Sequence, residues 1–474
     1  MRINPRYETR SDTMSRTNPQ AKRATLTEGA VAPLLVRLTL PMIVGVVSIL
    51  AFNLVDTFFV GRLGTEQLAA MSFTFPVVLV IGSLAMGLGI GTSALVSRAI
   101  GEGNMARVQR LTTDALSLSL IIVIAAAMVG LATINPLFRA LGAEGAVLGY
   151  INTYMTIWYW GMIFVVVPMV GNSAIRATGD TRTPSFIMMV VVVVNIILDP
   201  LLIFGIGPFP ALGIAGAGIA TVIARAITFI VSVWVLFVRE EMLTFRRVSW
   251  SAVFASWRAV LHLGLPAAAT QIIVPLSLGV ITRLVAMYGT EAVAAMGVAT
   301  RLETFALTVV LALGSVLGPF VGQNWGAGKV ARVREAIDMS QRFAMLLGVV
   351  TFALLFAFAR PIGSIFSSDP AVVEVIVLYV RIVAISYGFH GVLQLSTTVL
   401  NVLNRPYEAA ALSLLRMVGL YIPLALVGRA LFGLTGVFAA AAVASVLSGA
   451  LAFVRVKRAI HPTEPARQVA VSPS

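Results

Sequence analysis

The sequence predicts an all-α polytopic membrane protein whose twelve transmembrane helices form two six-helix lobes. Three observations predict this fold: an apolar composition, twelve apolar runs of membrane-spanning length, and an internal duplication of the chain. Of the 474 residues, 58% are hydrophobic and 11% are charged, whereas about 25% of the residues of a soluble domain are charged. The chain therefore lacks the polar surface of a soluble protein, and we expect the lipid bilayer to surround it.

The apolar runs indicate helices. A helix of about 20 apolar residues crosses the hydrocarbon core of a bilayer, and continuous runs differ from the alternating pattern of barrel strands. The runs fall at 34–60, 69–97, 114–135, 148–170, 184–206, 211–238, 259–287, 294–321, 340–360, 371–396, 408–428 and 432–454.

The distribution of charge explains the net charge of +14. Most of the 34 lysines and arginines lie in the two tails and the even-numbered loops, while the odd-numbered loops hold only Arg62, Arg139, Arg360 and Arg429. By the positive-inside rule both termini lie in the cytoplasm, which predicts a multi-pass protein of the cytoplasmic (inner) cell membrane. The basic residues orient the chain, and we expect no nucleic-acid partner.

Thiol and metal chemistry are not expected. The chain has no cysteine, and its three histidines, His262, His390 and His461, have no partner at metal-ligand spacing. Residues 1–30 are polar and basic without an apolar core, which predicts a disordered cytosolic tail rather than a signal peptide. We therefore expect a protein that is not an enzyme and needs no cofactor.

The second half of the chain repeats the first at an offset of 225 residues. Pro41 falls on Pro266, and "GEGNMARV" at 101–108 falls on "GAGKVARV" at 326–333. Each copy has an even number of runs, so the two copies enter the membrane in the same orientation and should enclose a cavity. The predicted parts are a tail at 1–30, an N-lobe at 31–238, a cytosolic linker at 239–258, a C-lobe at 259–458 and a cytosolic tail at 459–474. A carrier built from two such halves is expected to work as a monomer.

The two copies differ in their acidic residues. Asp56 falls on Ile281, and Asn195 and Asp199 fall near Met417 and Ile422. The prolines recur, because Pro41 matches Pro266 and Pro200 lies near Pro423, so helix kinks at Pro41 and Pro200 are expected as shared architecture. The acids occur in one copy only, which indicates a function in the N-lobe.

Asp56, Asn195 and Asp199 form the predicted cation site. A charged residue at a helix centre costs about 2.5–3.5 kcal/mol on insertion scales. Asp56 lies roughly 9 Å and Asp199 roughly 12 Å from the outer ends of their helices at 1.5 Å per residue, so the two depths are similar. Asn195 is one turn from Asp199 on the same face. Such a cluster can exchange H⁺ or bind Na⁺; the alternative is that Asp56 snorkels to the interface and Asp199 bonds to a neighbouring helix.

Other polar residues within the runs are weaker candidates. Tyr154, Asn172 and Thr221 can face the same cavity or make ordinary hydrogen bonds between helices. Arg301 and Glu303 in "ATRLETFA" are interpreted as an internal ion pair, with a part for Glu303 in coupling as the alternative.

Several motifs together resemble the multidrug and toxic compound extrusion (MATE) transporters, prokaryotic branch. They are "LVDTFFVGRLGTEQLAAMS", "RAIGEGN", "IRATGDTRTP", "NIILDP" and the repeated "GAGK", and the resemblance runs from about residue 30 to 458. It implies two six-helix lobes, alternating access and a cation site at Asp56, Asn195 and Asp199. Tyr154, Asn172 and Thr221 correspond to further polar positions of the family. Some members carry an acid in the seventh helix, whereas this chain has only apolar residues and Gln271 around Val274.

The predicted function is secondary active antiport. Amphipathic or cationic small molecules would leave the cell in exchange for H⁺ or Na⁺. One alternative keeps this architecture and moves a lipid-linked precursor, and a less favoured one is a membrane-embedded hydrolase. The residues name neither the substrate nor the coupling ion.

Overall fold

The computed structural model describes residues 25–245 and 249–460, and the regular structure in these ranges is helical. Helices that are long and apolar enough to span a membrane occur throughout the described residues. The α-helices are α1 (Val31–Gly61), α2 (Thr65–Gly101), α3 (Met105–Ala140), α4 (Gly145–Gly161), α5 (Ile163–Ala177), α6 (Arg182–Phe204), α7 (Ile214–Trp234), α8 (Trp250–Ala286), α9 (Thr290–Gly326), α10 (Val330–Phe366), α11 (Pro370–Val383), α12 (Tyr387–Val402), α13 (Pro406–Leu414) and α14 (Ile422–Ile460). Short 3-10 or π-helical segments join or precede them at Thr25–Thr27, Val235–Arg239, Ala384–Ser386 and Leu415–Tyr421.

These helices form the twelve predicted spans once three breaks are taken into account. α4 and α5 are one span bent by 43°, and α11 and α12 form one span, Pro370–Val402. The 55-residue segment Pro406–Ile460 contains two spans, because it folds back at Gly433, where φ is 60° and ψ is −138°. A Cβ atom on Gly428 or Gly436 would clash with the backbone of the other, as expected for the two arms of a hairpin.

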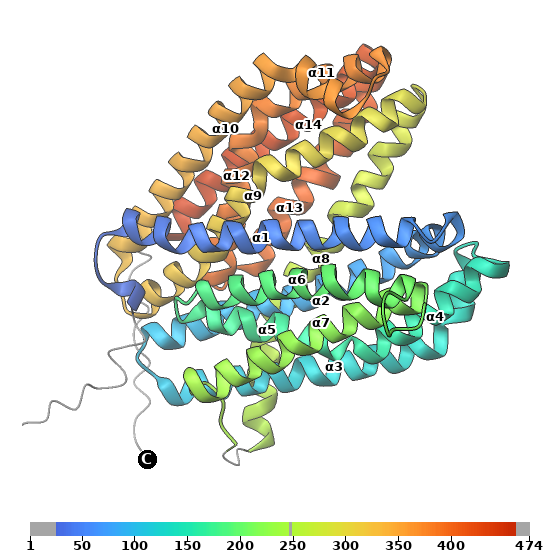
Figure 1. Cartoon of the computed structure of the whole chain (residues 1–474). Helices are drawn as coiled ribbons and strands as arrows, with labels where there is room; N and C mark the ends of the chain where they lie inside the picture. Colours follow the sequence, from blue (N-terminus) through green and yellow to red (C-terminus); the bar gives the residue numbers. More distant parts are fainter. Residues whose placement is uncertain (1–24, 246–248, 461–474) are drawn as a thin grey trace, which may run out of the picture.

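The helices form two lobes, α1–α7 and α8–α14, that lie side by side at one end and diverge toward the other (Figure 1). The duplication is visible in the backbone, since Gly213 has φ 56° and ψ −132°, close to the values at Gly433. Both positions turn the chain between the fifth and sixth spans of a lobe, and their φ values lie in the left-handed region that favours glycine. The predicted architecture of two duplicated six-helix lobes is confirmed.

The two ends of the bundle carry different connections between the helices. The "basic end" is where α1 begins and α14 ends, together with the connections α2–α3, α5–α6, α7–α8, α9–α10 and α12–α13. The "opposite end" has the connections α1–α2, α3–α4, α6–α7, α8–α9 and α10–α11 and the turn at Gly433.

The lobes are closed against each other at the basic end. Glycines let the backbones touch: at this end a Cβ on Gly101 of α2 would clash with the backbone of Gln323 on α9. Nearer the middle of α2, a Cβ on Gly87 would clash with Gly264 of α8. The Gln323 side-chain amide donates to the Ala177 carbonyl of α5 over 2.7 Å. The Arg98 guanidinium donates to the Val402 carbonyl of α12. These contacts seal the basic end between the lobes.

The same helices separate toward the opposite end, as Figure 1 shows. Phe75 in the first turns of α2 is 64% exposed, and Phe305 in the corresponding half of α9 is 55% exposed. The two lobes are therefore farther apart at the opposite end than at the basic end (Figure 1).

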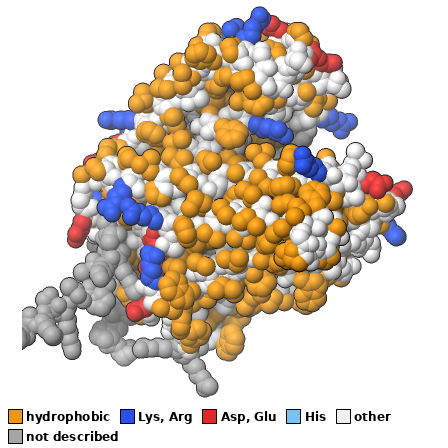
Figure 2. Space-filling model, in the orientation of Figure 1, with side chains coloured by type: hydrophobic (Ala, Val, Ile, Leu, Met, Phe, Trp, Pro, Cys, Tyr) orange, Lys and Arg blue, Asp and Glu red, His pale blue; other side chains and the backbone are white. Residues whose placement is uncertain are grey.

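The outer surface of the helices is apolar. Figure 2 shows hydrophobic side chains over most of the visible face, with charged side chains mainly near its margins. Exposed apolar area of this extent suits a lipid environment rather than water.

The structure corrects two predicted boundaries. The tail was placed at 1–30, but Thr25–Thr27 form a 3-10 turn, and the backbone N–H of the buried Leu26 donates to Gln323 Oε1 over 3.3 Å. This segment is ordered because its backbone groups find partners in α9; residues 1–24 lie outside the described ranges. The linker predicted at 239–258 ends earlier, since α8 already begins at Trp250, and the 461–474 part of the C-terminal tail is likewise not described.

The "ATGD" turn between α5 and α6 is a helix cap. Asp180 Oδ1 accepts hydrogen bonds from the backbone N–H groups of Arg182 and Thr183, both at 3.0 Å, which satisfies donors at the start of α6. Arg239, the last residue of the π-helical segment that follows α7, forms an ion pair with Asp180. Burial alone would raise the pKa of the Asp180 carboxyl, but the hydrogen bonds from Thr183 and the charge of Arg239 outweigh it and lower that pKa. The turn has a structural role.

Candidate functional site

A buried polar layer lies where α1, α6 and α7 pack together in the N-lobe. Apolar clusters lie on either side of this layer, and each is built from all three helices. The cluster toward the basic end contains Phe52, Val191, Val192 and Ala224, and the cluster toward the opposite end contains Val60, Ile203 and Ala217. The polar layer between them is therefore shielded from both membrane surfaces.

The structure brings Asp56, Asn195 and Asp199 together in this layer. Asp199 and Asn195 are fully buried, and Asp56 is 7% exposed. Asp56 lies five residues before the end of α1 and Asp199 five before the end of α6, so both are about 7.5 Å below the opposite end at 1.5 Å per residue. The two carboxyl groups are within electrostatic range of each other. The two acids therefore lie at the same depth, and the buried Asp56 does not snorkel to the interface.

The layer presents oxygen atoms that have no hydrogen-bond partner within the described residues. Asn195 Nδ2 donates to Asp199 Oδ1 over 3.0 Å, which leaves Asn195 Oδ1 and Asp199 Oδ2 unpaired. Asp56 Oδ1 and Thr221 Oγ1 are also buried and unpaired. An unpaired buried oxygen is unfavourable, and carboxylate, amide and hydroxyl oxygens are hard ligands that suit H⁺ or Na⁺. The layer therefore offers oxygen atoms of the kind that a small cation prefers.

Arg225 of α7 is a member of this site that the sequence reasoning did not select. Its guanidinium lies 4.9 Å from the centre of the Phe52 ring and within electrostatic range of Asp56 and Tyr154. It forms no ion pair of 4 Å or less with Asp56 among the described residues. A single arginine inside the sixth run was the available signal, because a charge within a membrane is normally paired.

The weaker N-lobe candidates separate into two groups. Thr221 belongs to the polar layer, and Tyr154 of α4 packs beside it, since Tyr154 Cδ2 would lie 3.6 Å from a Cβ on Gly218. Asn172 lies five residues before the end of α5 at the basic end, in the other half of the membrane. It is buried with an unpaired Oδ1, but the structure does not place it with Asp56.

α1 and α6 continue as α-helix through Pro41 and Pro200. Pro200 has no N–H to donate to the carbonyl of Ile196, which lies one turn away beside Asn195. The kinks expected at Pro41 and Pro200 remain predictions.

The prediction of an ion pair between Arg301 and Glu303 was wrong. Glu303 of α9 points into the C-lobe, where Tyr379 Oη donates to Glu303 Oε2 over 3.0 Å and His390 Nδ1 lies 3.2 Å from Glu303 Oε1. Arg416 is within electrostatic range of the same carboxylate. Residues two apart on a helix point in different directions, so Arg301 cannot share the face of Glu303.

Arg301 instead lies on the face of α9 directed toward the N-lobe. It is 25 residues before Gly326, almost seven complete turns, and Gly326 touches the backbone of Arg98 in the N-lobe. Arg301 lies where the lobes have separated, and its side chain is exposed. It therefore places an exposed positive charge away from the polar cluster of Glu303.

The C-lobe polar cluster supports a stability prediction. Glu303→Gln should lower the free energy of unfolding by about 1–3 kcal/mol, because a buried charged acceptor shared by Tyr379 and His390 is lost. The check is the melting temperature of the purified protein. Glu374→Gln, which removes an exposed partner of Arg360, is the control and should have little effect; equal melting temperatures for both variants would contradict the prediction.

The C-lobe does not repeat the acidic layer. Ile281, the counterpart of Asp56, is fully buried, and Met417 is 1% exposed; both belong to one apolar cluster. No group of three His, Cys, Asp or Glu residues suited to a metal ion occurs in the described ranges. The unpaired oxygens around Asp56 and Asp199 thus distinguish the N-lobe.

Two duplicated six-helix lobes that are in contact at one end and diverge toward the other, with a buried acidic cluster inside the N-lobe, define a two-lobe membrane transporter. A family model described as MatE matches residues 41–201 and again residues 266–427, once in each lobe. The chain belongs to this family, the multidrug and toxic compound extrusion transporters, and is accordingly a multi-pass membrane transporter of small molecules rather than an enzyme.

Individual relatives support this family assignment. The chain is 39% identical to a FAD transporter of Shewanella oneidensis, over 93% of this chain and 97% of that protein. It is 28% identical to the probable multidrug resistance protein YoeA of Bacillus subtilis, over 79% and 82%. The crystal structure of the MATE transporter VcmN from Vibrio cholerae in its bent form covers 93% of this chain, with 32% identity and a TM-score of 0.86; 98% of that chain is matched.

Proposed function

We propose that the protein is a cation-coupled antiporter that exports small amphipathic molecules. The observation that supports this most strongly is the set of unpaired, buried oxygens of Asp56, Asn195 and Asp199. Such a set is costly unless a cation binds there during the cycle.

The charges of the layer suggest one coupling cation per cycle. Asp56 and Asp199 carry two negative charges when ionised, and Arg225 supplies one positive charge nearby. One H⁺ or Na⁺ then makes the layer neutral. Asn195 holds the geometry by donating to Asp199 Oδ1.

The proposed orientation places the basic end in the cytoplasm, following the positive-inside rule. The conformation described here is then open to the outside. A cation enters from outside, neutralises the layer, and favours the rearrangement of α1 against α6 and α7 that expels the substrate. Coupling requires that cation and substrate bind the two conformations with different affinities.

For the substrate we place flavin dinucleotides first. A relative at 39% identity is named a FAD transporter, and Arg301 provides an exposed cation where the lobes diverge, which suits the pyrophosphate of a dinucleotide. Cationic drugs are the second candidate, because YoeA and other relatives are named multidrug proteins.

The proposal is tested with purified full-length protein in proteoliposomes. Uptake of FAD and of ethidium is measured under an imposed pH gradient, an imposed Na⁺ gradient, and no gradient. We expect accumulation of at least one substrate under one gradient only. Equal equilibration under all three conditions would show that no cation is coupled, and hydrolysis of FAD without a gradient would favour an enzyme.

Substitution of Arg301 tests whether the substrate is an anion. Arg301→Gln should raise the KM for FAD about tenfold, equivalent to about 1.4 kcal/mol, while leaving the KM for ethidium unchanged or lower. Arg301→Lys keeps the positive charge and is the matched control. The substrate assignment fails if Arg301→Gln transports FAD with the wild-type KM.

A further inference from the structure

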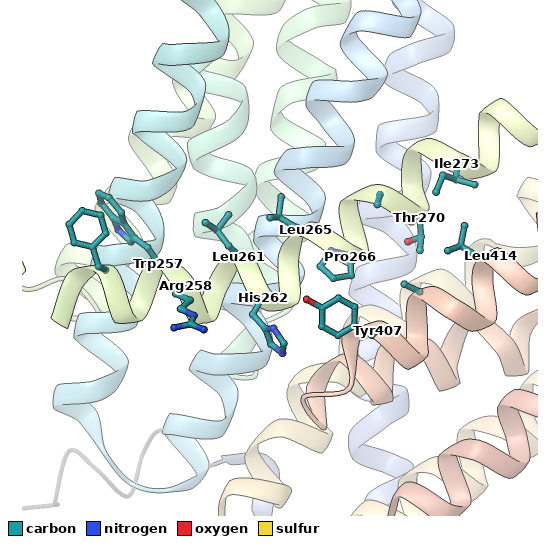
Figure 3. A pocket seen from close by; sticks show the side chains of 13 residues that line it. Trp257, Arg258, Leu261, His262, Leu265, Pro266, Thr270, Ile273, Tyr407 and Leu414 are labelled. Carbon is teal, nitrogen blue, oxygen red and sulfur yellow. The ribbon is translucent and has the colours of Figure 1, made fainter. Parts of the chain in front are cut away.

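A groove runs between α8 and α13 on the side of α8 turned away from α2. Its volume is about 830 Å³, and it is open to the surroundings of the protein (Figure 3). Arg258, His262 and Tyr407 form its polar part, and Leu265, Ile273 and Leu414 belong to its apolar part. The groove is separate from the acidic layer of the N-lobe, because none of its lining residues lies on α1, α6 or α7.

The polar part concentrates donors in one place. Arg258 and His262 are one helical turn apart on α8, and the His262 ring packs edge-on against the Tyr407 ring with 5.4 Å between the ring centres. Figure 3 shows the Tyr407 hydroxyl directed toward His262, with Arg258 beside them. No carboxylate is among the described side chains that line the groove, so the charge of Arg258 is available to an anion.

The groove lies at the depth of lipid headgroups at the basic end. Tyr407 is the second residue of α13, and Trp250, the first residue of α8, is 73% exposed. Exposed aromatic residues at helix ends mark the membrane interface. From this level the apolar wall continues along α8 to Ile273, toward the bilayer centre. This sequence of a cationic pocket followed by an apolar channel matches an anionic headgroup followed by an acyl chain.

We propose that this groove binds one anionic phospholipid of the surrounding bilayer, with its phosphate on Arg258 and Tyr407 and an acyl chain along Leu265 and Ile273. Phospholipids without a net negative charge bind the groove less tightly, because their headgroups do not compensate the charge of Arg258.

The position of the groove links the lipid to the arrangement of the lobes. α8 is attached to the N-lobe here, because Trp257 Nε1 donates to the Asp114 carbonyl of α3 over 2.9 Å and Gly264 packs on Gly87 of α2. α13 belongs to the C-lobe. A lipid that contacts Arg258 and Tyr407 together ties α13 to the part of α8 that packs on the N-lobe, and so stabilises the conformation that is closed at the basic end.

The test uses the purified full-length protein in a neutral detergent, titrated with phosphatidylglycerol or with phosphatidylcholine of the same acyl chains. Phosphatidylglycerol should raise the melting temperature of the wild type more than phosphatidylcholine does. Arg258→Gln should lose this difference, and Arg258→Lys should keep most of it. Arg455→Gln, an exposed arginine near the same end on α14, is the matched control and should behave as the wild type.

The proposal is overturned if the two lipids stabilise the wild type equally, or if Arg258→Gln and Arg455→Gln respond alike. It is also overturned if FAD or ethidium, and not phosphatidylglycerol, gives the stabilisation that depends on Arg258, since the groove would then be a substrate site. Should Arg258→Gln not fold, quenching of Trp257 by brominated phosphatidylglycerol decides, with Trp257→Phe as the reference. Equal quenching by brominated phosphatidylcholine would reject the proposal.

Discussion

Asp56→Asn and Asp199→Asn, made separately, are expected to abolish gradient-driven export while the protein still inserts and folds. Asparagine keeps the shape of the side chain but removes the charge that attracts the cation. Coupling free energies of about 1–3 kcal/mol change affinities by about 5–150-fold, so loss of the cation leaves only equilibration of the substrate. The measurement is the ratio of internal to external substrate in proteoliposomes under the driving gradient.

Asp114→Asn is the matched control for these two variants. Asp114 is also a buried N-lobe carboxylate, but it lies near the start of α3 at the basic end, 3.7 Å from Arg110. We expect it to keep the wild-type accumulation ratio. Full accumulation by both Asp56→Asn and Asp199→Asn would contradict the proposed role of the acidic layer.

Gly101→Val is expected to shift the protein away from the conformation closed at the basic end. A side chain at this position meets the backbone of Gln323, which cannot move aside as a flexible side chain can. Overpacking costs about 1–3 kcal/mol, enough to change a two-state equilibrium about 5–150-fold. The lobes should then open at the basic end and approach each other at the opposite end.

Spin labels on cysteines can measure this shift, because the chain has no cysteine of its own. Glu66 of α2 and Glu291 of α9 are repeat-related, exposed residues in the first turns of their helices at the opposite end. We expect Gly101→Val to increase the population with a short Glu66–Glu291 distance. Gly82→Val is the control, since Gly82 of α2 has open space around it. Identical distance distributions for the two variants would contradict the role of the Gly101–Gln323 contact in closing the basic end.

Most of the fold could be predicted from the sequence because lipid imposes a simple rule. Each span must be helical and apolar, so hydropathy alone locates it. The helix breaks were not predicted, because the bend at Met162 between α4 and α5 depends on packing in three dimensions. The sequence also did not predict that Leu26 is ordered, because its hydrogen-bond partner Gln323 lies almost 300 residues away.

The acidic layer could be predicted because the C-lobe served as an internal comparison. Residues shared by the copies support the fold, and residues found in one copy point to function, as Asp56 and Ile281 illustrate. The partners of Glu303 were missed because His390 and Tyr379 approach it only in the folded C-lobe. Arg301 was misassigned because nearness in sequence was taken for nearness on the helix.

The most direct test of the account is cation release on substrate binding. Purified protein in weakly buffered detergent solution receives FAD or ethidium, while a pH indicator and a Na⁺-sensitive dye report released ions. We predict release of about one cation per wild-type molecule, because one cation makes the set of Asp56, Asp199 and Arg225 neutral, and no release from Asp199→Asn. Equal release from the wild type and Asp199→Asn would contradict this prediction, because the cation would then be bound elsewhere.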